Sequence, residues 1–121
     1  MNKAIQITIE HKNHYLLIIC EPGTFTFQGM IPVIDQLKKT TQSLQCNKLL
    51  IDFRALQTPE IWEQYQSAAY MAEVWGPHIQ TAGVAFAENI NRLGENTAVN
   101  RGAHFAMFSD LETAQTWLLD S

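Results

Sequence analysis

The sequence predicts an α/β fold: a five-stranded mixed sheet with about four helices in the order ββαβαβαβα. Residues 5–10 alternate apolar and polar, and after a short polar turn residues 15–20 form a continuous apolar run, the pattern of an antiparallel hairpin. A helical pattern and another apolar strand at 48–53 then make a βαβ unit, whose strands run parallel. Two more helix–strand pairs and a last helix complete the predicted order.

Length and composition limit the class of protein. The 121 residues are in the size range of one domain, and we expect a single domain over residues 1–121. The net charge of −4 offers no basic surface for phosphate backbones, so nucleic acid is not an expected partner. No apolar run approaches the roughly 20 residues of a transmembrane helix, and residues 1–5 lack the apolar core of a signal peptide. We therefore expect a soluble cytoplasmic protein, with Cys20 and Cys46 reduced.

The first half of the chain shows one edge strand and two buried ones. The run at 15–20 is apolar throughout and should be central, with 5–10 at the edge. A helix is predicted from about Gln28 to Gln45, and Pro32 should lie in its first turn, where a missing N–H costs little. The expected buried face of this helix is Ile31, Ile34, Leu37, Thr41 and Leu44.

The second predicted helix follows the strand at 48–53. Thr58 is the expected N-cap, Pro59 the first helical residue, and the helix should end at Trp75 before Gly76 and Pro77. Its expected buried face consists of Ile61, Tyr65, Ala68, Ala69 and Ala72.

The last third repeats the strand–helix pattern. Strands are predicted at 81–87 and 104–108, and a weaker helix at 89–101 has Leu93 and Val99 as its apolar anchors. Ser109 and Glu112 have the spacing of a capping box. The final helix should bury Leu111, Ala114, Trp117 and Leu118. Right-handed crossovers would put the helices of sequentially added strands on one face, so the other face needs remaining helices, a partner or an apolar ligand.

Several stretches of this chain resemble the STAS domain, and more closely its SpoIIAA-like group, whose fold is related to SEC14-type (CRAL-TRIO) lipid-binding modules. The matching stretches are residues 49–53, 82–85, 100–105 running into 108–110, and 114–118. They extend over most of the chain, from about Ile5 to Leu118. The resemblance implies a four- to five-stranded sheet with helices and a non-catalytic binding role, and its SEC14-like side implies an apolar cleft.

The chain departs from this family pattern where the second helix begins. In similar anti-sigma-factor antagonists a phosphorylatable serine lies in an Asp-Ser-Ser-Gly turn. The corresponding residues here are Glu60, Ile61, Trp62 and Glu63, and the nearest hydroxyl belongs to Thr58. Because a phosphate needs an acceptor oxygen, the departure argues against a phosphorylation switch at this turn.

Charged residues near two strand ends are candidate site residues. Asp52 and Arg54 are two residues apart on a strand and should point to the same face, where they form an ion pair or an anion site. Alternatively, Asp52 caps loop amides and Arg54 is solvated. Arg101 either stabilises the third helix, because its positive charge lies at the negative C-terminal end of the helix dipole, or contacts an anionic ligand or a partner.

Aromatic residues of the second helix are the other candidates. Trp62, Tyr65, Tyr70 and Trp75 occupy more than one side of the helix, so core packing accounts for only some of them. Outward-facing aromatic side chains are typical of interfaces and of the edges of clefts. With Asp52, Arg54, Thr58 and Arg101 they make up the predicted ligand or partner residues.

The first predicted function is therefore a cytoplasmic, non-catalytic binding or regulatory module that contacts a protein partner or forms a homodimer. The alternative is a small carrier of an apolar, lipid-like molecule. No nucleotide-binding, hydrolase or metalloprotease motif occurs, so we expect neither an enzyme nor a cofactor or metal.

Overall fold

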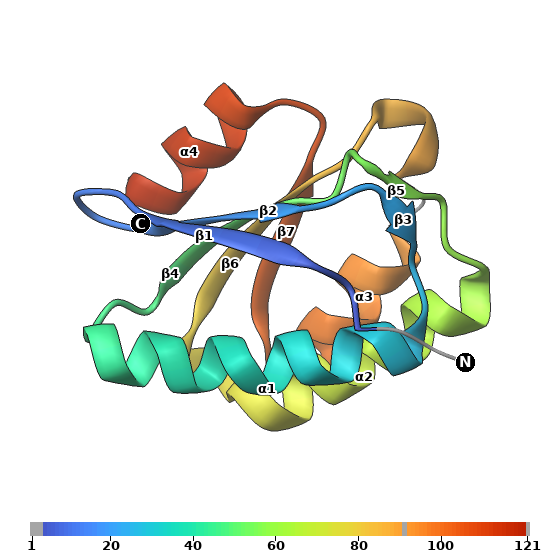
Figure 1. Cartoon of the computed structure of the whole chain (residues 1–121), viewed down its shortest axis with the longest axis horizontal. Coiled ribbons are helices and arrows are strands. Elements are labelled where there is room, and N and C mark those ends of the chain that lie inside the picture. Colours follow the sequence, from blue (N-terminus) through green and yellow to red (C-terminus); the bar gives the residue numbers. More distant parts are fainter. Residues whose placement is uncertain (1–3, 91, 121) are drawn as a thin grey trace.

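The computed structural model describes residues 4–90 and 92–120, and it confirms the predicted mixed sheet (Figure 1). The strand order is β1-β2-β4-β6-β7, with β1 antiparallel to β2 and the other neighbours parallel. β4, which contains the stretch 48–52, is the central strand. The five strands are β1 (Ile7–His11), β2 (Leu16–Cys20), β4 (Lys48–Asp52), β6 (Gln80–Val84) and β7 (His104–Phe108).

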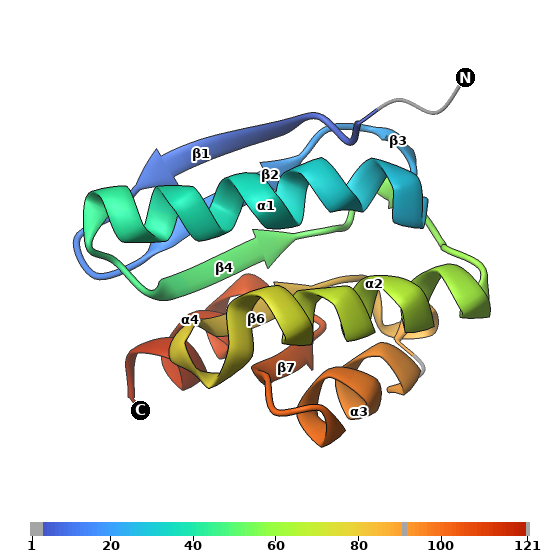
Figure 2. The same ribbon diagram turned by 90° about the horizontal axis from the view of Figure 1, so that it is seen from below.

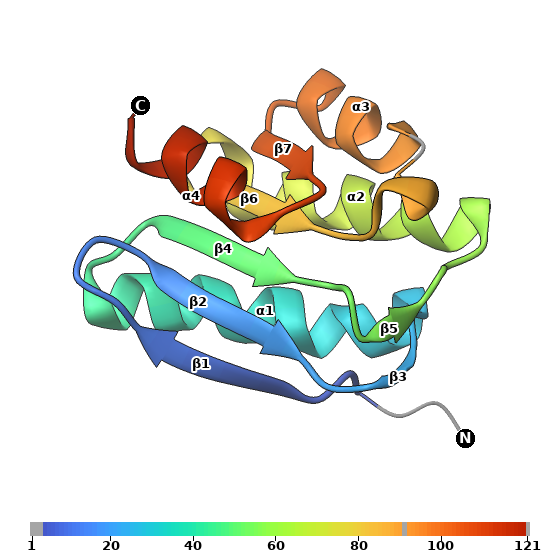
Figure 3. The same ribbon diagram turned by 90° about the horizontal axis from the view of Figure 1, so that it is seen from above.

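Of the four α-helices in the described part of the chain, three cover one face of the sheet and one covers the other (Figure 1). The first three are α1 (Phe27–Leu44), α2 (Ile61–Trp75) and α3 (Leu93–Asn100), and the fourth is α4 (Leu111–Leu119). From its own side, α4 packs against β4, β6 and β7 (Figure 3). The second face is therefore covered by a helix of the same chain, one of the three possibilities that the sequence left open.

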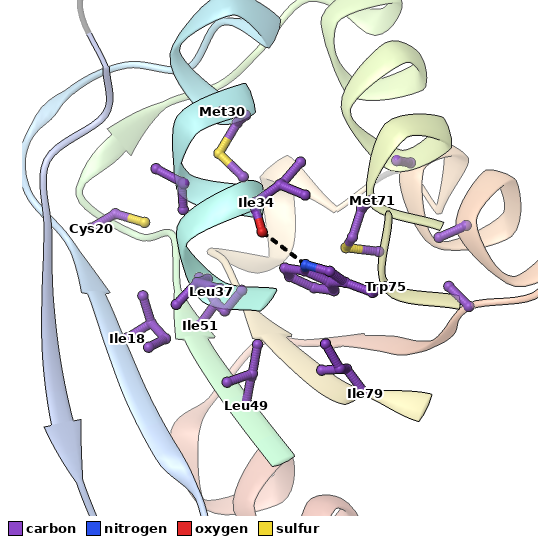
Figure 4. Packing of buried hydrophobic residues seen from close by; sticks show 14 of the residues in the cluster. Ile18, Cys20, Met30, Ile34, Leu37, Leu49, Ile51, Met71, Trp75 and Ile79 are labelled. Atoms are coloured by element: carbon purple, nitrogen blue, oxygen red, sulfur yellow. Dashed lines mark hydrogen bonds between the residues drawn. The ribbon is translucent and has the colours of Figure 1, made fainter. Parts of the chain in front are cut away.

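The larger core lies between the sheet and the three helices, and several hydrogen bonds join α1 to α2. The indole N–H of Trp75 donates to the carbonyl of Ile34 at 3.0 Å (Figure 4), and Lys38 Nζ donates to the carbonyl of Val74 at 2.7 Å. A smaller core under α4 consists of Leu50, Ala82, Val84, Ala114 and Leu118. The hydrogen bonds from Trp75 and Lys38 hold α2 alongside α1.

The start of α1 differs from the prediction. Thr26 is the N-cap, and its hydroxyl accepts from the amide of Gly29 at 2.9 Å. Because this cap sets the first helical residue at Phe27, Pro32 lies in the second turn and not in the first. Leu44, a predicted core residue, is exposed because it lies in the last turn, beyond Thr41, the last buried residue of the helix.

The caps of α2 and α4 also correct the sequence predictions. The N-cap of α2 is Glu60, without a side-chain cap bond, so Thr58 is not the cap. The N-cap of α4 is Asp110, whose carboxylate accepts from the Thr113 amide at 2.7 Å. The predicted capping box at Ser109 is therefore one residue too early, and Leu111, which opens α4, is exposed and not buried.

Between β6 and β7, the structure has less strand and helix than predicted. β6 ends at Val84, a 3₁₀ turn η2 (Ala87–Asn89) follows, and α3 begins at Leu93; residue 91 of the predicted helix lies outside the described residues. The buried residue of α3 is Ala98, and the predicted anchor Val99 is largely exposed.

Three short elements had no sequence signal. They are the parallel pair β3 (Gly23–Thr24) and β5 (Leu56–Gln57), and the 3₁₀ turn η1 (Gly76–His78). Among the described residues, no helix has the length and apolar character needed to cross a bilayer.

Candidate functional site

The first turns of α2 extend past the end of β4 (Figure 2) and carry the candidate site. Ile61, Trp62 and Tyr65 are 65%, 56% and 43% exposed, and we call these three residues the α2 surface. Ile61 and Tyr65 were predicted to be buried, and that prediction is wrong. Further along, the helix buries Ser67, Ala68, Met71, Ala72 and Trp75, which confirms the prediction for Ala68 and Ala72.

Tyr65 and Arg101, both predicted site residues, are in contact. Arg101 Nη2 donates to the Tyr65 hydroxyl at 2.8 Å, and the guanidinium carbon lies 5.6 Å from the centre of the tyrosine ring. This geometry combines a hydrogen bond with a cation–π contact. Tyr65 is therefore held toward α3, with a positive charge at the border of the α2 surface.

The other three aromatic residues of α2 point in different directions. Trp62 faces solvent, with its indole N–H donating to Glu60 at 2.8 Å. Tyr70 faces α1, where its hydroxyl donates to Asp35 at 2.7 Å, and this hydrogen bond raises the pKa of Tyr70. Trp75 is only 4% exposed and belongs to the core. Only Trp62 and Tyr65 of the four predicted aromatic residues are thus open to a protein partner.

Asp52 and Arg54 form the ion pair that was one of the two sequence interpretations. Arg54 Nε and Nη2 donate to the two carboxylate oxygens of Asp52 at 2.9 and 2.8 Å, and the Arg54 amide donates to the same group at 3.0 Å. Burial raises the pKa of Asp52, but the hydrogen bonds and charge of Arg54 outweigh it, so the pKa lies below its usual value. The pair ties the chain after β4 back onto the strand.

A cavity of about 130 Å³ lies behind α2, on the side of the helix that faces the sheet. Its walls are mainly apolar, and the lining residues include the predicted site residues Arg54, Thr58 and Trp75. Ser67 also lines it, although sequence reasoning did not single out this residue. A serine within the apolar face of the helix was the only signal that could have drawn attention to it.

The described residues also include side chains of the kinds that hold metal ions or act as nucleophiles. No group of three or more His, Cys, Asp or Glu side chains among them is arranged to hold a metal ion. Burial, and secondarily the negative charge of Asp52, raises the pKa of the Cys20 thiol to about 12, so it is a poor nucleophile at neutral pH. Both cysteines are free in this structure.

Comparison with known proteins relates the chain to others by fold alone. No protein-family model matches the sequence, and a search of curated proteins finds no match. An anti-sigma factor antagonist from Mycobacterium paratuberculosis is similar in structure, with 17% identity, 97% and 96% of the two chains covered, and a TM-score of 0.66. An uncharacterised protein from Shewanella loihica with a SpoIIAA-like fold has 19% identity, coverage of 98% and 96%, and a TM-score of 0.60.

A third structure, a variant of RsbS from Moorella thermoacetica, has 17% identity, coverage of 95% and 96%, and a TM-score of 0.59. In all three comparisons nearly the whole of both chains is aligned, so the similarity includes the N-terminal hairpin and the last helix. The chain therefore has the SpoIIAA-like fold that its sequence predicted.

Proposed function

We propose that this chain is a non-catalytic regulatory module that acts by binding another protein through the α2 surface. The observation that carries the proposal is the exposure of three large apolar side chains, Ile61, Trp62 and Tyr65, on adjacent turns of one helix. Contiguous exposed apolar groups of this size are typical of interaction sites. Tryptophan, tyrosine and arginine are also the residues that most often dominate binding energy at interfaces.

The two aromatic anchors are already held in place before any partner binds. Trp62 is bonded to Glu60, and Tyr65 is bonded to Arg101 and lies under its guanidinium group. A side chain that is ordered in the free protein loses less entropy on binding, so the contact is stronger for the same buried area. This arrangement suits a surface that recognises a protein.

The fold supports the same proposal. One protein of this fold is named an anti-sigma factor antagonist, which describes a protein that acts against another protein. We place the module in the cytoplasm as one domain, in keeping with the two free cysteines. A second copy of this chain is the first partner to test, because a homodimer needs no additional component.

Site-specific photo-crosslinking in cells tests the proposal. A photoreactive amino acid replaces Trp62 in one variant and Gln115 in the control, since Gln115 is exposed on α4 across the sheet. We expect a discrete adduct from position 62 and none from position 115. An adduct of twice the chain mass identifies a homodimer, and any other mass identifies a different protein.

A second substitution checks that the adduct reports the proposed surface. Tyr65→Ala should weaken the adduct formed from position 62 by at least about tenfold, because an anchor of this kind contributes on the order of 2 kcal/mol. Circular dichroism of the variant should be unchanged. Equal adducts from positions 62 and 115, or an adduct indifferent to Tyr65→Ala, would contradict the proposal.

A further inference from the structure

The border between α2 and α3 carries a positive charge that has no carboxylate beside it. α3 lies alongside α2 (Figure 2), and Arg101, the C-cap residue of α3, extends its side chain to Tyr65 on α2. Arg54 and Arg92, the other two arginines of the chain, each form an ion pair with a carboxylate. Arg101 forms no ion pair with any of the residues that the structure describes. Its charge is therefore left for a group from outside the chain.

Tyr65 and Arg101 together leave hydrogen-bond donors open to solvent. In their bond of 2.8 Å, Arg101 Nη2 is the donor and the Tyr65 hydroxyl oxygen is the acceptor. The hydroxyl hydrogen of Tyr65 and most N–H groups of the guanidinium stay available, because a guanidinium group has five such donors. Both residues are exposed. A phenol O–H next to a guanidinium group can bind the two oxygens of one carboxylate through charge-assisted hydrogen bonds.

Exposed apolar side chains occur on both helices close to these donors in the sequence. Ile61 precedes Tyr65 by four residues on α2 and is 65% exposed, and Val99, near the end of α3, is 49% exposed. Residues four apart are neighbours on a helix surface, so Ile61 and Tyr65 form one strip. The donors do not line the cavity behind α2, so a small free carboxylate would gain few other contacts here. A protein segment with apolar groups beside its carboxylate would bury Ile61 and Val99 as well.

Negative charges of the chain limit the partner further. Glu60 is exposed and bonded to Trp62, so a second negative group is disfavoured on that side of the α2 surface. The net charge of −4 disfavours a polyanion such as nucleic acid. The surface therefore suits one acidic side chain that lies among apolar ones, as on one face of an amphipathic helix.

We propose that the protein partner contacts the α2 surface with an amphipathic segment, and that a glutamate or aspartate of this segment binds Tyr65 and Arg101 together. This inference rests on the proposed function, because it names the chemistry of the partner at the same surface. Ile61 and Trp62 offer contact area that any apolar segment can bury, whereas Arg101 selects a segment with an acidic residue. Charge complementarity of this kind contributes to specificity more than to affinity.

Peptide display tests this chemistry before any natural partner is identified. A phage library of random linear peptides is selected against the immobilised full chain and against the variants Arg101→Gln and Lys39→Gln. Lys39→Gln is the matched control, because it removes the same charge from an exposed position of α1. We expect the unaltered chain and Lys39→Gln to enrich peptides with an acidic residue among apolar ones. Arg101→Gln should enrich apolar peptides without a preference for the acidic residue.

A double-mutant cycle then places the acidic residue of the peptide at Arg101. The most enriched peptide is synthesised with its acidic residue and with the corresponding amide, and fluorescence anisotropy measures the Kd of each form. The amide should weaken binding to the unaltered chain at least about fivefold, as for one charge-assisted hydrogen bond. With Arg101→Gln, the two forms should bind within about twofold of each other. Tyr65→Phe, which removes only the hydroxyl group, should give an intermediate ratio.

Three results would overturn the inference: enrichment of no peptide, enrichment of basic or uncharged peptides by the unaltered chain, and an equal effect of the amide on the unaltered chain and Arg101→Gln. Circular dichroism of each variant should match that of the unaltered chain.

The substitution Trp62→Ala separates this inference from the proposed function. Peptides that lose affinity with Trp62→Ala but show no acidic preference overturn the inference and leave the α2 surface as a binding site. Peptides that bind Trp62→Ala as tightly as the unaltered chain bind elsewhere, and they overturn both.

Discussion

The substitution Trp75→Phe should lower the free energy of unfolding by about 2–3 kcal/mol. Two buried carbon atoms are lost from the ring, at about 0.8 kcal/mol for each buried CH₂-sized group. The hydrogen bond from the indole N–H to the carbonyl of Ile34, 3.0 Å long and fully buried, is lost as well and contributes about 1 kcal/mol. Since this bond joins α1 to α2, its loss should also loosen the packing of α2 on the sheet.

Urea denaturation followed by far-ultraviolet circular dichroism measures the effect. Trp62→Phe is the matched control: its indole is 56% exposed and its hydrogen bond to Glu60 is at the surface, so we expect a change within about 0.5 kcal/mol. For both variants, the slope of the unfolding free energy against urea concentration should equal that of the unaltered protein. Equal losses for the two substitutions, or a loss below about 1 kcal/mol for Trp75→Phe, would refute the assigned environments.

Three further predictions concern charge, thiol reactivity and packing. Asp52→Asn should cost about 1–2 kcal/mol at pH 7, since charge-assisted bonds are lost at a site partly open to solvent. The carboxylate has a pKa below its usual value, so its stabilisation is present above about pH 4 and disappears as the pH falls further. The difference in free energy of unfolding between the unaltered protein and Asp52→Asn should therefore shrink in urea titrations at acid pH. A difference that stays constant with pH would contradict this prediction. Iodoacetamide at pH 8 should modify Cys46 at least about a hundredfold faster than Cys20, because burial raises the pKa of Cys20 to about 12. Peptide mass mapping measures both rates, and equal rates would show that the Cys20 thiol is not protected by burial. Gly83→Val should destabilise the protein by about 3 kcal/mol, since even a Cβ at this position would lie within 3.3 Å of three side chains. Gly23→Val is the control, because its added Cβ meets nothing within 4 Å. Thermal unfolding should give a clearly lower midpoint for Gly83→Val, and similar midpoints for the two variants would refute the prediction.

Much of the fold could be predicted because its signals are local. Alternation at 5–10 and the apolar runs at 15–20 and 48–53 depend only on which side chains can lie on a strand, and each predicted strand is present. The helix caps were less secure. Ser109 and Asp110 are both good N-cap residues, and only the path of the chain into α4 decides that Asp110 accepts the bond.

The candidate site could be located in part. Asp52 ends β4 and Arg54 follows it by two residues, so their pairing depends on local geometry and could be anticipated. The contact between Tyr65 and Arg101 joins two helices and could not. Each residue was chosen alone, and the packing of α3 against α2 brought them together.

The sequence by itself determined the order of the main elements, the buried character of the strand at 48–52 and the aromatic content of α2, because periodicity and composition act within a few turns of chain. Only the tertiary structure decided that Trp62 is exposed and Trp75 buried, since this depends on how far α2 extends past the end of β4 (Figure 2). It also decided that residues of several distant elements line one cavity. A cavity is the space left between side chains of elements that are far apart in the sequence, so no local sequence pattern can predict it.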